Sequence, residues 1–173
     1  MREEENPLDK EEDYIRIENV ITQSGNKKDN WGGIYMSKTY NIFISHSWAY
    51  DEQYKGLKKL LDSNPYFHYV DYSVPKDDPI HNAGTDKQLK EAITEQMKHA
   101  SVVIILAGVY STYSKWINKE IDIAKNGFFN AKKIIAVQYW GAEKTSSVVK
   151  ESADKIVKWQ ADSIIDAIRE LSN

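Results

Sequence analysis

The sequence predicts an α/β fold in which helices flank a doubly wound, mainly parallel sheet of about five strands. Three observations support this prediction. Short segments that are apolar at every position alternate with longer segments in which apolar residues recur at three- and four-residue spacing. Uninterrupted apolar strands are typical of a parallel sheet covered on both faces, and their alternation with amphipathic helices is typical of the α/β class. The hydrophobic content of 41% is enough for a core in a chain of 173 residues.

The first half of the predicted domain holds two strands and two helices. Apolar runs predict strands over 40–44 and 67–70, and a loop rich in Pro, Asp and Gly spans 73–84. Thr85 and Gln88 are spaced as a capping box, in which the hydroxyl and the amide side chain each satisfy a free backbone N–H of the next helix. The inward faces of the two helices carry Tyr50, Tyr54, Leu57 and Leu61, and then Leu89, Ile93, Met97 and Ala100.

The second half continues the same alternation. Strands are predicted over 102–106, 133–137 and, as a short fifth strand, 156–157. Between the first two of these, a helix is expected that Ser114 caps and Gly127 ends. Asp162 is expected to cap the last helix. That helix turns Ile164, Ile165, Ile168 and Leu171 inward.

Residues 1–37 differ in composition from the domain predicted over 38–173. The first 13 residues carry seven acids and two bases, which predicts an acidic, poorly ordered N-terminal extension. Since the whole chain has a net charge of −3, the remainder is close to neutral and slightly basic. A nucleic-acid-binding domain would show a concentrated basic face, so we expect no nucleic-acid partner.

Composition also excludes several classes of site. The chain has no cysteine, which excludes disulfides, thiolate catalysis and cysteine-based metal sites and is compatible with a reducing cytoplasm. No segment approaches the roughly 20 apolar residues of a membrane span, and the acidic N-terminus does not resemble a secretory signal. We therefore expect a cytoplasmic protein without a membrane partner or a metal.

Ligands of doubly wound folds bind beyond the carboxyl ends of the strands, so the residues found there limit the chemistry. A phosphoacceptor receiver would have acids after the first strand and Asp after the third, whereas this chain has Ser45-His46 and Ala107-Gly108. A dinucleotide-binding glycine fingerprint and a P-loop are both missing from the sequence. These three common occupants of the fold are therefore excluded.

One carboxylate, Glu120, is well placed for chemistry near that edge. It lies four residues after Trp116, on the same face of the predicted helix. At 100° per residue, Glu120 falls at the border of the helix's buried stripe. Partial burial would raise the pKa of its carboxyl, while nearby amides or cations would lower it. The alternative is an ordinary surface acid that pairs with Lys119, Lys115 or a lysine of a neighbouring chain.

Other strand ends allow two interpretations each. His46 follows the first strand, where it can reach a bound sugar or phosphate or simply lie beside a helix cap formed by Ser45 or Ser47. Asp71 and Ser73 end the second strand, where they can bind a ligand or form the turn through local backbone hydrogen bonds.

Three segments, in order along the chain, resemble the motifs of TIR domains, which have a flavodoxin-like fold. Residues 40–47 (YNIFISHS) resemble the first box, 71–75 followed by Gly84 resemble the second strand and BB loop, and 114–120 resemble the S-x-W-x-x-x-E motif. From Lys38 to about Asn173, the chain is similar to the TIR-like family that includes ThsB of the Thoeris antiphage system. The loop 75–82 differs from that of animal adaptor TIR domains, and the first 37 residues have no counterpart.

The resemblance implies an enzyme of the NAD glycohydrolase or ADP-ribosyl cyclase type, with NAD as substrate and no cofactor. Glu120 would hold the ribose next to nicotinamide and stabilise the developing oxocarbenium ion. Substrate-binding positions would be Ser45, His46, Asp71, Ser73, Tyr110 and Trp116. The product would be an ADP-ribose-type, cyclic or conjugated signal that activates an effector partner in antiphage defence, and self-assembly is a further implication. The alternative is a non-catalytic TIR-like module that assembles with signalling partners.

Overall fold

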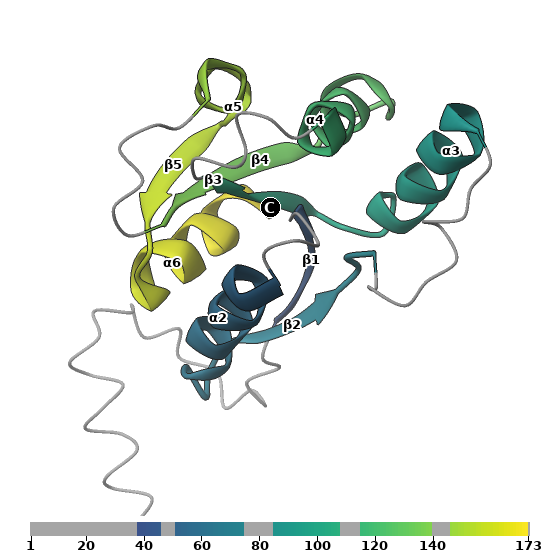
Figure 1. Ribbon diagram of the computed structural model, residues 1–173. Helices are drawn as coiled ribbons and strands as arrows, with labels where there is room; N and C mark the ends of the chain where they lie inside the picture. The colour runs from purple at the N-terminus through teal and green to yellow at the C-terminus, as the bar shows by residue number, and fades with distance from the viewer. Residues whose placement is uncertain (1–37, 46–50, 75–84, 108–114, 140–145, 173) are drawn as a thin grey trace, which may run out of the picture. The chain divides into compact units, whose positions relative to one another are not determined.

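The structure is a computed structural model that describes residues 38–45, 51–74, 85–107, 115–139 and 146–172. In these ranges five parallel strands form one sheet in the order β2-β1-β3-β4-β5 (Figure 1). The strands are β1 (Thr39–Ser45), β2 (His68–Asp71), β3 (Val102–Ala107), β4 (Lys133–Gln138) and β5 (Lys155–Lys158). The predicted α/β class, with a doubly wound sheet of five strands, is confirmed.

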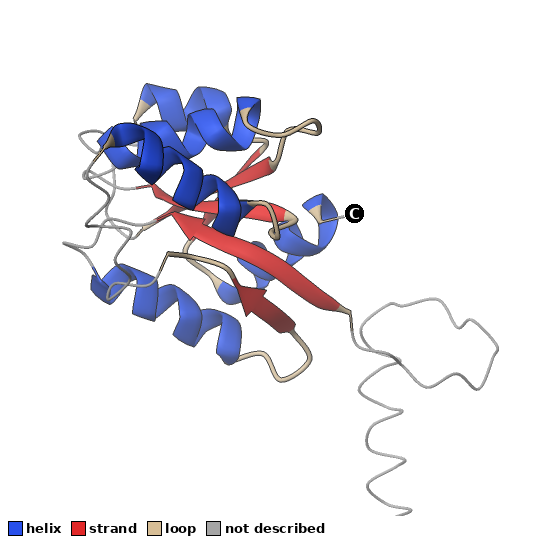
Figure 2. Cartoon of the chain, turned by 90° about the vertical axis from the view of Figure 1, so that its right-hand side faces the viewer, coloured by secondary structure: helices blue, strands red, loops and turns tan. Residues whose placement is uncertain are grey.

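Helices cover both faces of the sheet (Figure 2). On one face lie α2 (Asp51–Asp62) and α6 (Ala161–Leu171), and on the other lie α3 (Asp86–Met97), α4 (Lys115–Asn126) and α5 (Ser147–Ser152). Successive side chains of a strand point to opposite faces, so Phe43 packs on the α3–α4 side while Ile42 and Ile44 pack on the α2–α6 side.

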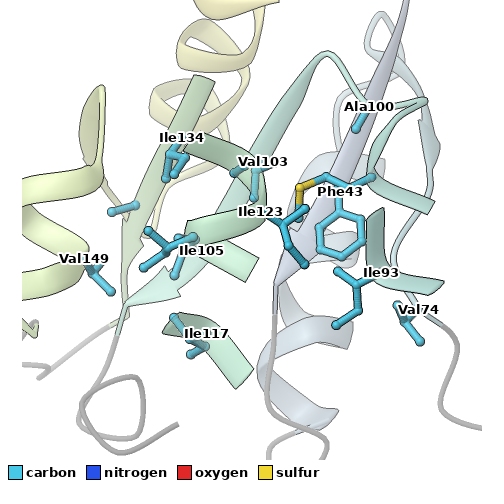
Figure 3. Packing of buried hydrophobic residues seen from close by; sticks show 14 of the residues in the cluster. Phe43, Val74, Ile93, Ala100, Val103, Ile105, Ile117, Ile123, Ile134 and Val149 are labelled. Atoms are coloured by element: carbon cyan, nitrogen blue, oxygen red, sulfur yellow. The ribbon is translucent and has the colours of Figure 1, made fainter. Parts of the chain in front are cut away.

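The central strand shows why the strands are apolar throughout. All six residues of β3 are buried, because helices cover both of its faces. Figure 3 shows Val103 and Ile105 of this strand packed with Phe43 of β1 and Ile123 of α4. Each fully buried aliphatic side chain contributes about 1.5–3 kcal/mol relative to exposure. This packing holds α4 against the sheet and so determines where the residues of its first turns lie.

Two of the predicted helix ends are confirmed. Thr85 is the N-cap of α3, and its hydroxyl accepts a hydrogen bond from the backbone N–H of Gln88. The Gln88 side chain accepts a hydrogen bond from this hydroxyl, whereas the predicted capping box has it accept from a backbone N–H, so the Thr85 half of that prediction is the confirmed part. Helix α4 ends before Gly127, whose N–H donates to the carbonyl of Ile123. A side chain at Gly127 would lie 2.6 Å from that carbonyl oxygen, so the close approach requires glycine.

Other details differ from the prediction. Asp162 does not cap the last helix, because α6 already begins at Ala161 and its N-cap is Gln160. The short helix α5 was not predicted, and Ala100 lies three residues beyond the end of α3, although it is buried in the same core. Tyr50 and Ser114 lie outside the described residues.

Residues 37–173 form one compact unit. The predicted acidic extension over 1–37 lies outside the described residues, so the domain division stays a prediction. Among the helices that the structure describes, none has the length and apolar character needed to cross a membrane. In the same ranges, no group of three or more acidic or histidine side chains is arranged to hold a metal ion.

Candidate active site

The site forms at the carboxyl edge of the sheet, where β1 and β3 lie side by side. Strands β2 and β3 lie on opposite sides of β1 in the sheet. The connection from β1 to β2 runs through α2, and the one from β2 to β3 runs through α3 on the other face, so the chain changes direction between β1 and β3. Divergence of this kind leaves a crevice in which doubly wound folds bind their ligands. Ser45 ends β1 at that edge, and its backbone is in register with Ile105 of β3. Helix α4 follows β3 and brings Glu120 to the same place.

Glu120 and Ser45 are in direct contact. The Ser45 hydroxyl donates a hydrogen bond to Oε2 of Glu120, which joins the second turn of α4 to the end of β1. Ser45 has no exposed surface and Glu120 is only 8% exposed. Sequence spacing predicted a residue at the border of the buried stripe, whereas the structure shows a buried residue, because β1 faces Glu120 at this point.

The charged residues beside Glu120 on α4 pair with α3 instead. Nζ of Lys119 lies 2.8 Å from Oδ1 of Asp86, and Nζ of Lys90 lies 3.0 Å from Oδ2 of Asp122. The alternative in which Glu120 is an ordinary surface acid paired with Lys119 is therefore wrong. The side chain of Lys115, the other lysine considered, lies outside the described part of the chain.

Burial dominates the electrostatics of this carboxyl. Removal from water raises the pKa of Glu120 to about 7, and the hydrogen bond from Ser45 opposes this rise without cancelling it. A carboxyl of this kind is present in protonated and ionised forms at neutral pH. It can therefore exchange a proton, or become a carboxylate when a ligand brings positive charge beside it.

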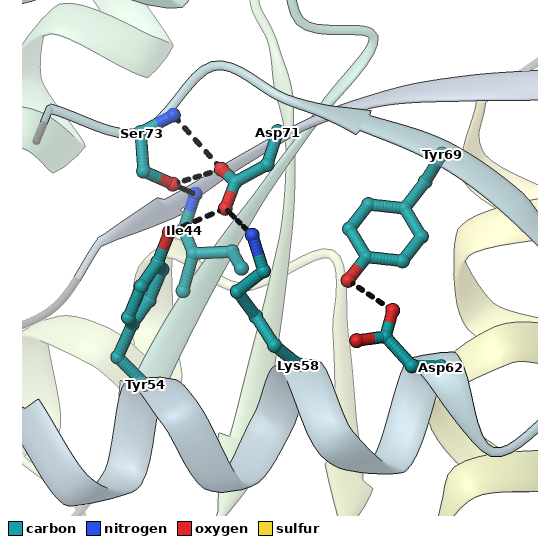
Figure 4. A network of polar contacts seen from close by, with 7 residues as sticks. All are labelled: Ile44, Tyr54, Lys58, Asp62, Tyr69, Asp71 and Ser73. Carbon is teal, nitrogen blue, oxygen red and sulfur yellow. Dashed lines mark hydrogen bonds and ion pairs between the residues drawn. The ribbon is translucent and has the colours of Figure 1, made fainter.

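A second cluster of polar side chains lies at the end of β2 and contacts Ile44, the residue before Ser45 (Figure 4). The hydroxyl of Ser73 accepts a hydrogen bond from the backbone N–H of Ile44 at 2.7 Å and donates one to Oδ1 of Asp71. The same Oδ1 accepts from the backbone N–H of Ser73 at 2.9 Å. Asp71 and Ser73 therefore make the local turn contacts that were one of the two alternatives for them.

Helix α2 completes this cluster. The Tyr54 hydroxyl donates to Oδ2 of Asp71 at 2.6 Å, and Nζ of Lys58 lies 3.3 Å from the same oxygen. Burial opposes ionisation of Asp71, but the hydrogen bonds from Ser73 and Tyr54 and the charge of Lys58 together lower its pKa. Burial and the bond to Asp71 raise the pKa of Tyr54, so that its hydroxyl remains a donor.

The structure thus brings three of the predicted site residues, Ser45, Ser73 and Glu120, close to the end of β1. In the described ranges the buried polar or charged residues are these three and Ser146, so the buried polarity is concentrated here. His46 and Tyr110 lie outside the described residues. Trp116 lies in the first turn of α4, but its side chain is outside the described part.

Sequence reasoning missed Tyr54 and Lys58 as parts of this region. The apolar spacing predicts that Tyr54 lies on the inward face of its helix. That spacing explains where the ring lies, but it does not predict the hydrogen bond from its hydroxyl to Asp71. The signal was present in the spacing, since Tyr54 and Lys58 are four residues apart and form one polar face at the edge of that stripe. The partner of this polar face, Asp71 of β2, can be identified only when it is known that α2 packs beside β2.

The Ser45–Glu120 contact can be tested by itself. In Ser45→Ala the carboxyl loses the donor that favours its charged form, so the pKa of Glu120 is expected to rise above its wild-type value. The measurement is a pH titration of the side-chain carboxyl signal by ¹³C NMR. Glu95 is the internal reference, because it is exposed and pairs with Lys98, three residues further along the chain. Its titration should be unchanged in the variant. A Glu120 pKa that falls or stays the same in this variant would contradict the contact.

Comparison with known proteins identifies a family whose model matches this chain. The family model described as the Thoeris protein ThsB, TIR-like domain, matches residues 43–144, more than half of the chain. The matched segment begins in β1, extends past β4, and includes Ser45, Asp71, Ser73 and Glu120. Among curated proteins, none matches the chain.

Proposed function

The chain belongs to the TIR-like domain family of the Thoeris protein ThsB, and from this membership we propose that it cleaves NAD, with Glu120 as the catalytic carboxylate. The observation that carries the proposal is the burial of Glu120 against Ser45 at the ligand-binding edge of the sheet. Burying an ionisable carboxyl is costly for a fold, and groups with strongly shifted pKa values concentrate at functional sites. A module that acted only through surface contacts would not need this acid.

The reaction divides into a bond cleavage and a capture step. The bond between C1′ of the ribose and the nicotinamide nitrogen breaks, and its electron pair leaves with nicotinamide, which becomes neutral. Positive charge then develops over C1′ and the ring oxygen of the ribose. The ionised Glu120 carboxylate offsets this charge, and a carboxylate already fixed in place needs no reorganisation to do so. Water, or a nucleophilic atom of the same ADP-ribose, then attacks C1′ and releases a proton.

The electrostatics of the site suit this order of events. In the free protein, burial keeps a large fraction of Glu120 protonated at neutral pH. Bound NAD would place the positively charged nicotinamide ring near this group, which favours the ionised form. The charged form would therefore be present when the sugar cation develops.

The wider proposal follows from the family. We propose that the product is a nucleotide of the ADP-ribose type, in particular a cyclic one. In antiphage defence this nucleotide would act as a signal that activates an effector protein in the cytoplasm. The second candidate, a non-catalytic TIR-like module that assembles with partners, is the alternative that the experiment below has to exclude.

The test is to incubate the full-length chain with NAD, both alone and with a lysate of phage-infected cells. Nicotinamide release is followed by chromatography, and the nucleotide product is identified by mass spectrometry. We expect equimolar release of nicotinamide and an ADP-ribose product in at least one of the two conditions. A cyclic product would be lighter than ADP-ribose by one water. If neither condition released nicotinamide above a heat-denatured control, the enzyme proposal would be wrong and the interaction module would remain.

A further inference from the structure

The backbone ladder between β1 and β2 stops before the end of β1. Register pairs run from Thr39 with His68 to Ile42 with Asp71, and the N–H of Tyr72 donates to the carbonyl of Ile42 at 2.8 Å. Beyond this point β2 has ended, although β1 continues to Ser45. On the β2 side, the last residues of β1 are therefore supported by something other than strand pairing.

Ser73 provides that support through its side chain. Its hydroxyl oxygen accepts the N–H of Ile44, the residue directly before Ser45, in the place where a strand carbonyl would otherwise stand. The hydroxyl has a single proton, which it donates to Asp71, so its lone pairs are directed at β1. Ser73 is 9% exposed, so water has little access to compete for this bond.

Asp71 in turn is held from three sides. Its Oδ1 accepts both the hydroxyl and the N–H of Ser73, and its Oδ2 accepts the Tyr54 hydroxyl and lies near the Lys58 ammonium. Hydrogen bonds to an ionised acceptor are roughly twice as strong as neutral ones. The result is a continuous hydrogen-bonded connection from α2, through the end of β2, to the residue next to Ser45 (Figure 4).

On its other side Ser45 is held by β3, through its register with Ile105. The hydroxyl that contacts Glu120 is thus placed by a strand on one side and by the Asp71–Ser73 connection on the other. A shift of about 1 Å at a catalytic contact can cost about 100-fold in rate, so support of this kind matters for turnover.

We propose that Asp71 and Ser73 are positioning residues, which act through the backbone of β1 to hold Ser45 against Glu120 and do not themselves contact NAD. The expected effect of these two residues on the rate of NAD cleavage rests on the proposed function. Their expected effect on the contact between Ser45 and Glu120 does not. This assignment differs from the substrate-binding role that the family resemblance implied for these two residues.

The first test is Ser73→Ala, with Ser73→Thr as the conservative variant that keeps the hydroxyl. In steady-state NAD cleavage, Ser73→Ala should lower kcat about tenfold and leave KM within about twofold, because alignment is lost and substrate contact is not. Ser73→Thr should recover most of the lost kcat. A rise in KM with unchanged kcat would instead indicate direct contact with NAD and would overturn the proposal.

The second test uses two matched tyrosines, in case Ser73→Ala fails to fold. Each of the two tyrosines donates a hydrogen bond that links α2 to β2. The Tyr54 hydroxyl lies 2.6 Å from Asp71, and the Tyr69 hydroxyl lies 2.7 Å from Asp62. Figure 4 shows that the Tyr69–Asp62 pair stands apart from Ser73 and Ile44. Tyr54→Phe should lower kcat about threefold and Tyr69→Phe should leave it unchanged. Equal losses in both variants, or no loss in either, would overturn the proposal.

A third measurement needs no activity and therefore separates this inference from the proposed function. The pKa of Glu120 is measured by carboxyl ¹³C NMR in the wild type, in Ser73→Ala and in Tyr69→Phe. If Ser73 holds Ser45 in place, Ser73→Ala raises that pKa in the same direction as Ser45→Ala, and Tyr69→Phe does not. An unchanged or lower pKa in Ser73→Ala overturns the inference even when NAD is cleaved. The predicted rise supports it even when NAD is not cleaved.

Discussion

Glu120→Gln is expected to lower kcat/KM for nicotinamide release by about 100- to 1,000-fold. Removal of one preorganised group that stabilises transition-state charge typically costs about this much in rate. Glutamine keeps the size and shape of the side chain, and its carbonyl oxygen can still accept the hydrogen bond from Ser45. What it loses is the negative charge that offsets the ribosyl cation, so the fold is retained and the chemistry is not.

The matched control is Asp122→Asn, two residues along the same helix. It makes the same change from acid to amide, but Asp122 is an exposed residue that pairs with Lys90. Its kcat/KM should stay within about twofold of the wild type. Nicotinamide release by Glu120→Gln at more than half the wild-type rate would refute the assignment of the catalytic group. Equal losses in both variants would indicate a general effect of charge on α4.

The fold was predictable because each element has its own local pattern. The run from Val102 to Leu106 has no polar residue, and burial of all of β3 on both faces explains why. The helix α5, by contrast, has only six residues and too little periodicity to be recognised. The cap of α6 was misplaced by two residues because Asp162 suits an N-cap and a first helical turn equally well.

The candidate site was predictable in part, for a related reason. Glu120 could be placed near the ligand-binding edge from its helix and the strand before it. Whether it is buried depends on Ser45, which is 75 residues away in the sequence and meets it only in the folded chain. The contacts of Asp71 with Tyr54 and Lys58 likewise depend on how α2 packs beside β2. Tertiary pairing of this kind leaves no periodic signal in a single sequence.

The burial that serves the proposed chemistry should also cost stability, and this can be measured as a function of pH. The pKa of Glu120 is raised from 4.5 to about 7 on folding, so the folded protein binds the proton more tightly than the unfolded chain. The contribution of this carboxyl to stability is therefore greatest where it is protonated and is lost as pH rises through about 7. From about pH 5 to about pH 8 the free energy of unfolding of the wild type should fall by about 2 kcal/mol more than that of Glu120→Gln.

This difference is measured by urea unfolding at several pH values and corresponds to about 5 °C in the difference between melting temperatures. All other titratable groups are the same in both proteins and therefore cancel in the difference. Asp122→Asn is again the control, because the hydrogen bond from Asn126 and the bond to Lys90 lower the pKa of Asp122, which leaves it ionised throughout this range. Its profile should run parallel to that of the wild type. If the profile of Glu120→Gln also ran parallel, Glu120 would not be a buried carboxyl with a raised pKa, and the electrostatic argument for catalysis would lose its basis whatever the activity of the variant.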